Sequence, residues 1–245
     1  MKLIEVKDNE EMSVEVCKLV KMKINTLATP VLGLATGSTP ERLYELLVDE
    51  VQKESLSFKN VTTFNLDEYV GISGNDRNSY RYYMNSKFFD HIDIQIENTH
   101  VPNGLAKNIS KECENYESRI EELKGIDLQI LGIGRNGHIG FNEPGTPFST
   151  QTHVVELEES TRKANSRFFQ SLEEVPTRAI TMGIDTIMKS KEIVLLVSGE
   201  KKAEALNALI NGEVSEKFPA SILQKHPHVT IFADEAVLKS PVMNL

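Results

Sequence analysis

The sequence predicts an α/β fold in which a mostly parallel sheet is covered by helices on both faces. Short, continuous apolar runs alternate along the chain with longer amphipathic segments. The first pattern is typical of strands buried on both sides, and the second is typical of helices that cover a sheet. No internal repeat, low-complexity tract or linker interrupts the alternation, so we expect a single domain over residues 1–245.

Each element is expected from its own pattern. The clearest strands, all short apolar runs, are Val31–Ala35, Val61–Leu66, Asp127–Ile133, Ile193–Val197 and Val229–Ala233. Weaker strand patterns cover Thr152–Leu157 and Arg178–Met182. Helical spacing of apolar residues covers Glu10–Leu27, Pro40–Val51, Ser79–Phe89, Ser110–Leu123, Lys201–Asn211 and Ala220–Gln224. Ligands bind beyond the carboxyl ends of the strands in such a sheet, so the residues after each strand are the candidates for a site.

The composition restricts the class of partner and the compartment. The 245 residues carry 27 basic and 36 acidic side chains, a formal charge of −9, which disfavours nucleic acid or an anionic membrane as partner. Cys17 and Cys113 lack the spacing of a metal or redox motif and favour a reducing compartment. The acidic N-terminus does not resemble a signal peptide, and no apolar run approaches the ~18 residues of a membrane span. We expect a cytoplasmic protein that acts on a small molecule, as a monomer or homo-oligomer.

The first candidate segment, ATGSTP, follows the apolar residues Val31–Leu34 and precedes a helix. Ser38 or Thr39 is expected to cap that helix, with Pro40 in its first turn. Free backbone N–H groups and the positive end of the helix dipole then offer a site for an anion. The alternative is an ordinary capped turn, because neither a Walker A loop nor a GxGxxG motif is present.

Basic side chains elsewhere in the sequence would strengthen a phosphate site. Arg162 or Arg167 in STRKANSRFF, and Lys201 or Lys202 after the strand IVLLV, are the candidates. Each is equally consistent with a solvated surface charge, the usual fate of lysine and arginine.

The second candidate segment is the carboxylate pair Asp67 and Glu68, which follows the strand Val61–Leu66. Neighbouring side chains on an extended chain point to opposite sides, so one carboxylate can face the ligand while the other faces a helix cap or a cation. A partly desolvated carboxylate at a strand end is suited to act as a general base. The alternative is a helix or loop cap.

The third candidate segment is LGIGRNGHIGFNEPG, at Leu131–Gly145. Its glycines permit close approach of the backbone to a ligand, and His138 with Glu143 can form an imidazole–carboxylate pair for proton transfer near neutral pH. Histidine spacing for a metal is absent, and so is the GxSxG motif of a nucleophilic serine. The segment therefore favours acid–base chemistry on a small anionic substrate, with no metal.

The sequence resembles the glucosamine-6-phosphate deaminase family over almost its whole length. The stretches that carry the resemblance are GLATGSTP, VTTFNLDEYVG, NSYRYYMNSKFFDHIDI, LGIGRNGHIGFNEPG, TRKANSRFF and the SG-x-K-KA segment near Lys202. The resemblance implies a doubly wound, Rossmann-like α/β sheet in one deaminase-like domain. It also implies a hydrolase that converts glucosamine 6-phosphate and water to fructose 6-phosphate and ammonia, without metal or organic cofactor.

The resemblance also implies roles for particular residues. It gives Asp67 the role of general base, His138 the role of ring opening and Glu143 the role of assisting the histidine. The implied substrate contacts are Gly37, Ser38, Thr39, Glu68, Arg167 and Lys202. Many members read GNDGH where this chain has Asn136, and an asparagine can form hydrogen bonds but cannot take up a proton. We therefore expect Asn136 in the site and Glu143 as the anionic partner of His138.

Two other functions remain open. A 6-phosphogluconolactonase shares the architecture and a Gly-His loop, but usually has DER where this chain has DEY, and a different stretch in place of GFNEPG. A sugar-phosphate-sensing domain would keep the phosphate loop without an acid–base set.

We also expect a lid between Glu143 and Arg167, with Glu156, Glu158 and Glu159 exposed on it; a static surface helix is the alternative.

The resemblance to the family also raises the question of allosteric regulation. Some members are hexamers that N-acetylglucosamine 6-phosphate activates at an inter-subunit site built from basic residues after the NEP motif and a C-terminal tail. Here the matching segment, TPFSTQTHVVELEES, has His153 as its only candidate cation. We therefore expect no such activation.

Overall fold

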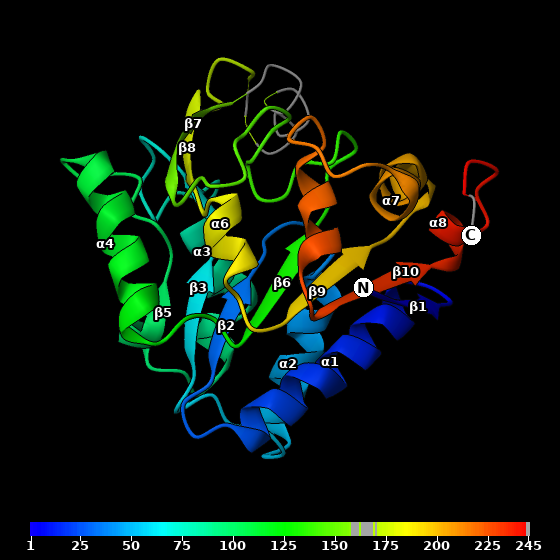
Figure 1. Cartoon of the computed structure of the whole chain (residues 1–245). Coiled ribbons are helices and arrows are strands. Elements are labelled where there is room, and N and C mark those ends of the chain that lie inside the picture. Colours follow the sequence, from blue (N-terminus) through cyan, green and yellow to red (C-terminus); the bar gives the residue numbers. More distant parts are fainter. Residues whose placement is uncertain (158–161, 163–168, 170, 244–245) are drawn as a thin grey trace.

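The central sheet has seven strands, all parallel to their neighbours, as the sequence predicts. The computed structural model describes residues 1–157, 162, 169 and 171–243. The strands are β1 Lys2–Val6, β2 Val31–Leu34, β3 Thr62–Asn65, β5 Thr99–His100, β6 Leu128–Gly132, β9 Ile193–Val197 and β10 Val229–Asp234. Their order across the sheet is β1-β10-β9-β6-β2-β3-β5 (Figure 1).

Helices cover both faces of this sheet, which confirms the predicted doubly wound α/β fold (Figure 1). The α-helices are α1 Asn9–Thr26, α2 Glu41–Gln52, α3 Tyr80–Lys87, α4 Ile109–Glu122, α6 Ile184–Met188, α7 Ala203–Asn211 and α8 Glu235–Leu238. Short 3-10 helices are η1 Phe89–His91, η2 Ile96–Asn98, η4 Glu200–Lys202 and η5 Pro219–Lys225. One apolar cluster joins α1, α2 and α3 to the sheet, and a second joins α4, α6, α7, α8 and η5 to it.

A second, smaller sheet continues directly from the end of β3. It contains β4 Asp67–Tyr69, β8 Arg178–Thr181 and β7 His153–Glu156, all antiparallel, in the order β4-β8-β7. Only Leu66 separates β3 from β4, so the chain leaves the central sheet and enters the second one at that residue. The sequence places Asp67 after a strand, whereas the structure makes it the first residue of another strand.

Two local expectations differ from the structure. The edge strand β1 is missed because its sequence, KLIEV, alternates and buries only Val6 fully, whereas the prediction relied on continuous apolar runs. The expectation that Ser38 or Thr39 caps α2 is wrong. Pro40 occupies the N-cap position in a helical conformation (φ −84°, ψ −1°), and no side chain caps the helix there.

The carboxyl ends of four adjacent strands position the candidate site. β9, β6, β2 and β3 are neighbours in the sheet and end at the same edge. The segments that follow them are the ones that the sequence singles out: the Lys202 segment, the glycine-rich loop, ATGSTP and Asp67–Tyr69. The sheet order therefore brings these segments side by side.

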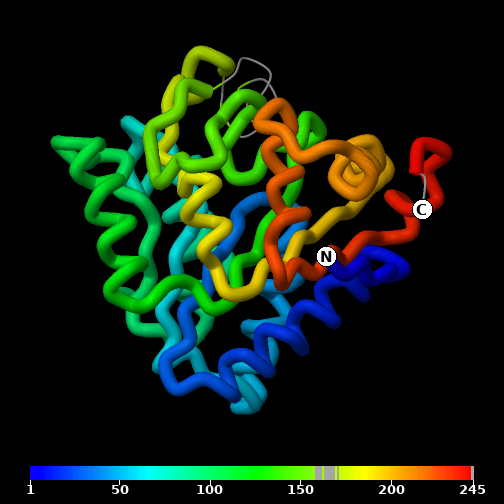
Figure 2. Tube along the Cα trace, viewed as in Figure 1, coloured from blue at the N-terminus to red at the C-terminus, as the bar shows by residue number. Residues whose placement is uncertain are grey.

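A segment distant in sequence supports the glycine-rich loop. The N–H of Gly145 donates to the carbonyl of Glu216 (2.7 Å), and the N–H of Ala220 donates to the carbonyl of Gly137 (2.8 Å). In the tube view the two segments, green and orange, lie next to each other (Figure 2). The loop is therefore held at two points rather than projecting freely from β6.

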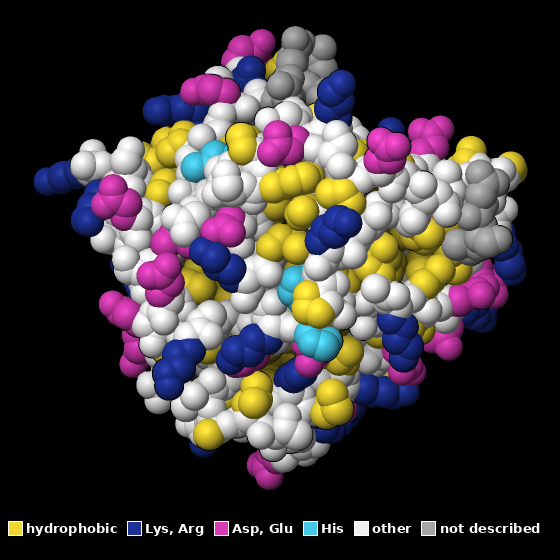
Figure 3. Space-filling view, in the orientation of Figure 1, with side chains coloured by type: hydrophobic (Ala, Val, Ile, Leu, Met, Phe, Trp, Pro, Cys, Tyr) yellow, Lys and Arg dark blue, Asp and Glu magenta, His cyan; other side chains and the backbone are white. Residues whose placement is uncertain are grey.

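The surface carries charges of both signs. Lysine and arginine side chains lie among aspartate and glutamate on the face shown in Figure 3, without a continuous basic area. Both cysteines are free and buried. Within the described residues, no helix has the length and apolar character needed to cross a membrane.

Candidate active site

The imidazole of His138 lies against the backbone of Gly134, at the start of the glycine-rich loop. A Cβ atom at residue 134 would come within 2.2–2.4 Å of atoms in the His138 ring, so only glycine leaves room for the ring. The N–H of Gly134 donates to the carbonyl of His138 (2.8 Å), which closes the loop on itself. The glycine thus sets the position of the histidine side chain.

Asn136 lies between His138 and Glu143 and bonds to both. Its Oδ1 is 2.7 Å from Nδ1 of His138, and its Nδ2 donates to Oε2 of Glu143 over 2.6 Å. The direct separation between Nδ1 of His138 and Oε1 of Glu143 is longer, at 3.5 Å. Glu143 is therefore the nearby anion that the sequence predicts, but the shorter contact with the imidazole comes from Asn136.

Asp67 is a buried carboxylic acid beside the same loop. Its relative exposure is 7%. Burial, together with the charge of Glu68, raises the pKa of Asp67 to about 8. A Cβ atom on Gly140 would lie 3.7 Å from Oδ2 of Asp67, so the loop backbone passes directly by this carboxyl group. The fold thus brings Asp67 to the loop that carries His138.

Glu68, the neighbour of Asp67, is used by the fold itself. Its Oε1 accepts hydrogen bonds from the N–H groups of Tyr69 and Tyr80, and its Oε2 accepts one from Arg81. These bonds anchor the first turn of α3, where Ser79 is the N-cap residue. Burial raises the pKa of Glu68, and the three N–H donors oppose that effect. This differs from the expected substrate contact, because the side chain is buried against α3.

Two tyrosine hydroxyl groups hold the backbone of the ATGSTP segment, in which Ser38 is exposed. The hydroxyl of Tyr44 donates to the carbonyl of Ala35 (2.6 Å), and the hydroxyl of Tyr83 donates to the carbonyl of Gly37 (2.7 Å). Gly37 has a φ of +98°, a conformation that favours glycine. Within the described residues, no hydrogen bond uses the hydroxyl groups of Ser38 and Thr39, so both are available to a ligand.

Lys202 reaches from the end of β9 to the end of β6. Its Nζ donates to the carbonyl of Ile133 (2.7 Å), which leaves two N–H donors for a ligand. Burial and the nearby charge of Arg135 lower the pKa of Lys202. Its neighbour Lys201 is exposed. This arrangement favours Lys202 over Lys201 as the phosphate contact.

Of the two arginines that the sequence offers as phosphate contacts, only Arg162 lies within the described residues. Arg162 donates from Nη2 to the carbonyls of Leu172 and Val175, both at 2.9 Å, and so supports the segment before β8. Arg167 lies outside the described residues, as do Glu158 and Glu159 of the expected lid.

Two buried polar residues next to the site, Asn142 and Thr181, are not among the site residues predicted from the sequence. Asn142 donates from Nδ2 to the carbonyls of Ile139 (2.8 Å) and Met182 (2.9 Å). Thr181 accepts a hydrogen bond from the N–H of Phe141 (3.0 Å). Asn142 stands in the predicted loop between Phe141 and Glu143, and this position in the sequence indicates a place near the site. The weak strand pattern around Thr181 contains no such indication.

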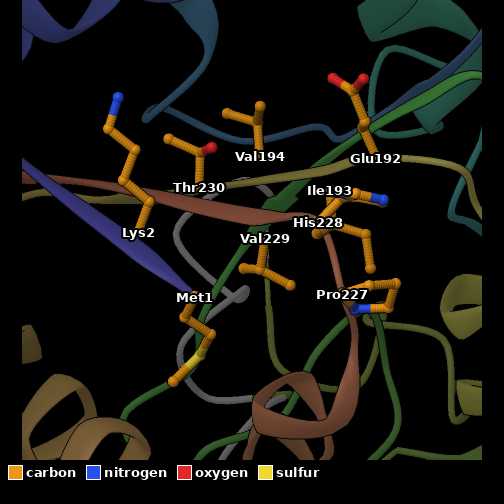
Figure 4. A pocket seen from close by; sticks show the side chains of 9 residues that line it. All are labelled: Met1, Lys2, Glu192, Ile193, Val194, Pro227, His228, Val229 and Thr230. Atoms are coloured by element: carbon orange, nitrogen blue, oxygen red, sulfur yellow. The ribbon is translucent and has the colours of Figure 1, made fainter.

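A hollow at the amino ends of the strands, opposite the carboxyl ends where the candidate site lies, does not belong to this site. It has a volume of about 330 Å³ and lies where β1, β9 and β10 begin (Figure 4). Its lining includes Lys2, Glu192 and His228, and Glu192 is already paired with Lys23 at 2.5 Å. Among the described residues, no group of three or more His, Cys, Asp or Glu side chains is placed to hold a metal ion.

The fold and the site define an α/β enzyme with acid–base groups beyond the carboxyl ends of a parallel sheet. The sequence model of the family described as glucosamine-6-phosphate isomerases/6-phosphogluconolactonase matches residues 7–232. The chain belongs to that family.

Individual relatives point to one branch of the family. The glucosamine-6-phosphate deaminase of Oceanobacillus iheyensis is 59% identical over 239 residues, 98% of this chain and 96% of the relative. That of Shouchella clausii is 58% identical, covering 96% and 95% of the two chains. A solved structure of a monomeric glucosamine-6-phosphate deaminase superposes with a TM-score of 0.95 at 50% identity, over 98% of this chain and 99% of that one.

The lactonase branch is similar in fold alone. The 6-phosphogluconolactonase from Thermotoga maritima has a TM-score of 0.76 at 19% identity, over 96% of this chain and 99% of that one.

Proposed function

We propose that the chain is a glucosamine-6-phosphate deaminase, which converts glucosamine 6-phosphate and water to fructose 6-phosphate and ammonia. The single observation that carries the proposal is the meeting of Asp67 with the His138–Asn136–Glu143 group across the backbone of Gly140. The identities of 59% and 58% to relatives of that name support it. The chemistry is an isomerisation that ends in loss of the amine, and it counts as hydrolysis only because water is consumed.

His138 opens the sugar ring. The substrate is mostly a closed pyranose, so the C1 hydroxyl must lose a proton and the ring oxygen must gain one before C1 becomes an aldehyde. An imidazole can do both in turn near neutral pH. Asn136 and Glu143 hold the ring in place through Nδ1 and support the positive charge while it carries the extra proton.

Asp67 moves the proton at C2. In the ionised form it takes the C2 proton of the open-chain amino aldehyde. The C–H electron pair forms the C1–C2 double bond, the π pair of the C1 carbonyl moves to its oxygen, and that oxygen takes up a proton to give an enolamine. Return of the proton to C1 leaves a C2 imine, which adds water and releases ammonia to give the ketone. A C–H next to a carbonyl is a weak acid, so the base needs a high pKa and a fixed position, and the burial of Asp67 provides both.

The phosphate is bound at the other end of the site. Gly37, Ser38 and Thr39 offer N–H and hydroxyl donors at the end of β2, and Lys202 offers an ammonium group from the end of β9. Arg167 is the further cation that the family resemblance implies. Binding energy from this remote group serves to orient C1 and C2 against the catalytic residues.

We also propose that the chain acts as a single cytoplasmic domain without metal or organic cofactor. The buried free thiols of Cys17 and Cys113 support a reducing compartment.

Ammonia release from glucosamine 6-phosphate by the purified chain tests the proposed function. The expected result is stoichiometric ammonia and fructose 6-phosphate. Hydrolysis of 6-phosphogluconolactone without ammonia release would overturn the proposal in favour of the lactonase branch. Binding of sugar phosphates with neither reaction would favour a sensing domain.

A further inference from the structure

Two consecutive residues at the end of β8 hold the strand that carries Asp67. Thr181 is the direct partner of Asp67 in the antiparallel pairing of β4 with β8. The N–H of Met182 donates to the carbonyl of Leu66 over 2.6 Å, at the point where the chain passes from β3 into β4. The backbone position of Asp67 is therefore fixed from the β8 side.

The same two residues hold the glycine-rich loop. The hydroxyl oxygen of Thr181 accepts a hydrogen bond from the N–H of Phe141 (3.0 Å), and the carbonyl of Met182 accepts one from Nδ2 of Asn142 (2.9 Å). Phe141 and Asn142 follow His138 by only three and four positions in the sequence. Residues 181 and 182 thus link the strand of Asp67 with the loop of His138.

The contact is closest at Gly140. A Cβ atom at this position would lie 2.9 Å from Oγ1 of Thr181 and 3.7 Å from Oδ2 of Asp67. The φ of Gly140 is +57°, in the left-handed region. The Thr181 hydroxyl and the Asp67 carboxyl group therefore lie beside the same short piece of loop backbone, and Thr181 is itself fully buried.

We propose that Thr181 is a positioning residue, whose hydroxyl sets the spacing between Asp67 and His138 by bonding to the loop at Phe141. The inference rests on the proposed deaminase function. His138 and Asp67 act in succession on one bound sugar, at C1 and C2, so their separation must match the substrate. A misplacement of about 1 Å can cost about 10²-fold in rate.

The test compares three variants of Thr181 with a matched control. Thr181→Val keeps the shape of the side chain but removes the acceptor for the N–H of Phe141, Thr181→Ala removes the acceptor without new bulk, and Thr181→Ser keeps it. Thr63→Val is the control, because Thr63 is also fully buried in a strand but its hydroxyl has no hydrogen-bond partner within the described residues. Circular dichroism and thermal melting establish that each variant is folded.

The expected result is a split between kcat and KM. Thr181→Val and Thr181→Ala lower kcat about 10- to 100-fold and leave KM for glucosamine 6-phosphate within about threefold of wild type. Thr181→Ser stays within about threefold in both constants, as does Thr63→Val. If kcat of the folded Val or Ala variant equals that of wild type, or if Ser loses as much as Val, the inference is wrong.

A second measurement needs no activity. Hydrogen exchange of the backbone around residues 139–142 should be faster in Thr181→Val and Thr181→Ala than in wild type and Thr181→Ser. Equal exchange in all four proteins would overturn the inference even if the proposed reaction is correct. Absence of ammonia release by the wild-type chain, with the expected exchange pattern, would instead overturn the proposed function alone.

Discussion

A hydrogen bond of 2.7 Å joins Nδ1 of His138 to Oδ1 of Asn136. Since an amide oxygen can only accept, the hydrogen of this bond belongs to Nδ1. In the neutral ring Nε2 then has no hydrogen and is the nitrogen that accepts a proton. Under the proposed function, Asn136 would select the tautomer in which His138 begins ring opening as a base. The bond from Nδ2 of Asn136 to Glu143 keeps the amide oriented for this contact.

Asn136→Leu is expected to impair ring opening specifically. Leucine has a similar volume but forms neither bond, so the imidazole loses its fixed orientation and tautomer. We expect kcat/KM for glucosamine 6-phosphate to fall about 10²-fold. A substrate analogue that is already open-chain should lose much less, and His138→Gln should show the same contrast between the two substrates. Equal losses on the closed and open substrates would contradict the role of both residues.

The activity should depend on the ionisation of Asp67. Burial and the charge of Glu68 raise the pKa of this group to about 8 in the substrate-free protein, and only the ionised form can take the C2 proton. kcat/KM, which reports ionisations of the free enzyme, should therefore rise with pH up to about 8. Rates measured between about pH 5.5 and 9.5 at constant ionic strength check this, and a plateau already reached near pH 6 would argue against Asp67 as the base.

Asp67→Asn should abolish deamination and stabilise the protein at high pH. The amide keeps the shape of the side chain but cannot accept a proton, so a loss of at least ~10²-fold is expected.

The stability effect follows from the direction of the pKa shift. A carboxyl group whose folded pKa is about 8 favours the folded state fully below pH 3.8, and this contribution is lost as the pH rises towards 8. A neutral amide does not incur that loss. The variant should gain at least about 1 kcal/mol at pH 8, or about 2–4 °C in Tm, and the gain should shrink towards pH 4. Asp90→Asn, at an exposed position, is the control and should change Tm little at either pH.

Central strands could be predicted from sequence because their environment determines their composition. β9 Ile193–Val197 has the predicted bounds, since it lies between β6 and β10 and all five of its residues are buried. The edge strand β1 has no such constraint, because only Val6 is fully buried in it. In the second sheet, β7 and β8 lie within the weaker predicted patterns Thr152–Leu157 and Arg178–Met182. The pairing of Asp67 with Thr181 depends on a contact between distant parts of the chain that no local pattern encodes.

The residues of the candidate site also divide into those that the local sequence indicates and those whose role depends on the fold. Strand ends and residue types point to Asp67, His138 and Lys202 without any coordinates. The sequence allows one carboxylate of the Asp67–Glu68 pair to face the ligand and the other a helix cap, while the resemblance implies a substrate contact for Glu68. The three N–H donors that occupy Glu68 appear only in the fold. The place of Asn136 is likewise set by side-chain geometry, because its two bonds require the loop to bring Glu143 back towards His138.

Lys202→Ala should weaken binding of the phosphate group. We expect KM for glucosamine 6-phosphate to rise about 10- to 100-fold, the effect of losing one hydrogen-bonded charge, with a smaller change in kcat. The poor rate with glucosamine itself should not change, because this substrate has no phosphate. Lys201→Ala removes the same charge from the adjacent exposed residue and should leave KM nearly constant. If both variants behave alike, the phosphate does not contact Lys202.

The segment after the NEP motif lacks the positive charges that a second phosphate site would require. Burial lowers the pKa of His153, which disfavours the charged form of this side chain. A hollow of about 470 Å³ lies between α4 and β7 beside it, and its lining includes Glu114, Glu117 and Glu121. The carboxylate of Glu117 already accepts hydrogen bonds from Thr152 and Thr186. Binding a doubly charged phosphate requires fixed cations that offset its desolvation, and this hollow offers carboxylates instead.

The rate should therefore be hyperbolic in glucosamine 6-phosphate, and N-acetylglucosamine 6-phosphate should not activate the enzyme. Allosteric activation requires an effector that binds one of two states more tightly, and an acidic hollow gives a phosphate no such preference. Initial rates over a range of substrate concentrations, with and without the N-acetyl compound, check this. A sigmoidal curve that the N-acetyl compound makes hyperbolic would overturn the prediction. The cations for that effect would then have to come from a second copy of the chain, since His153 and the glutamates around it cannot supply them.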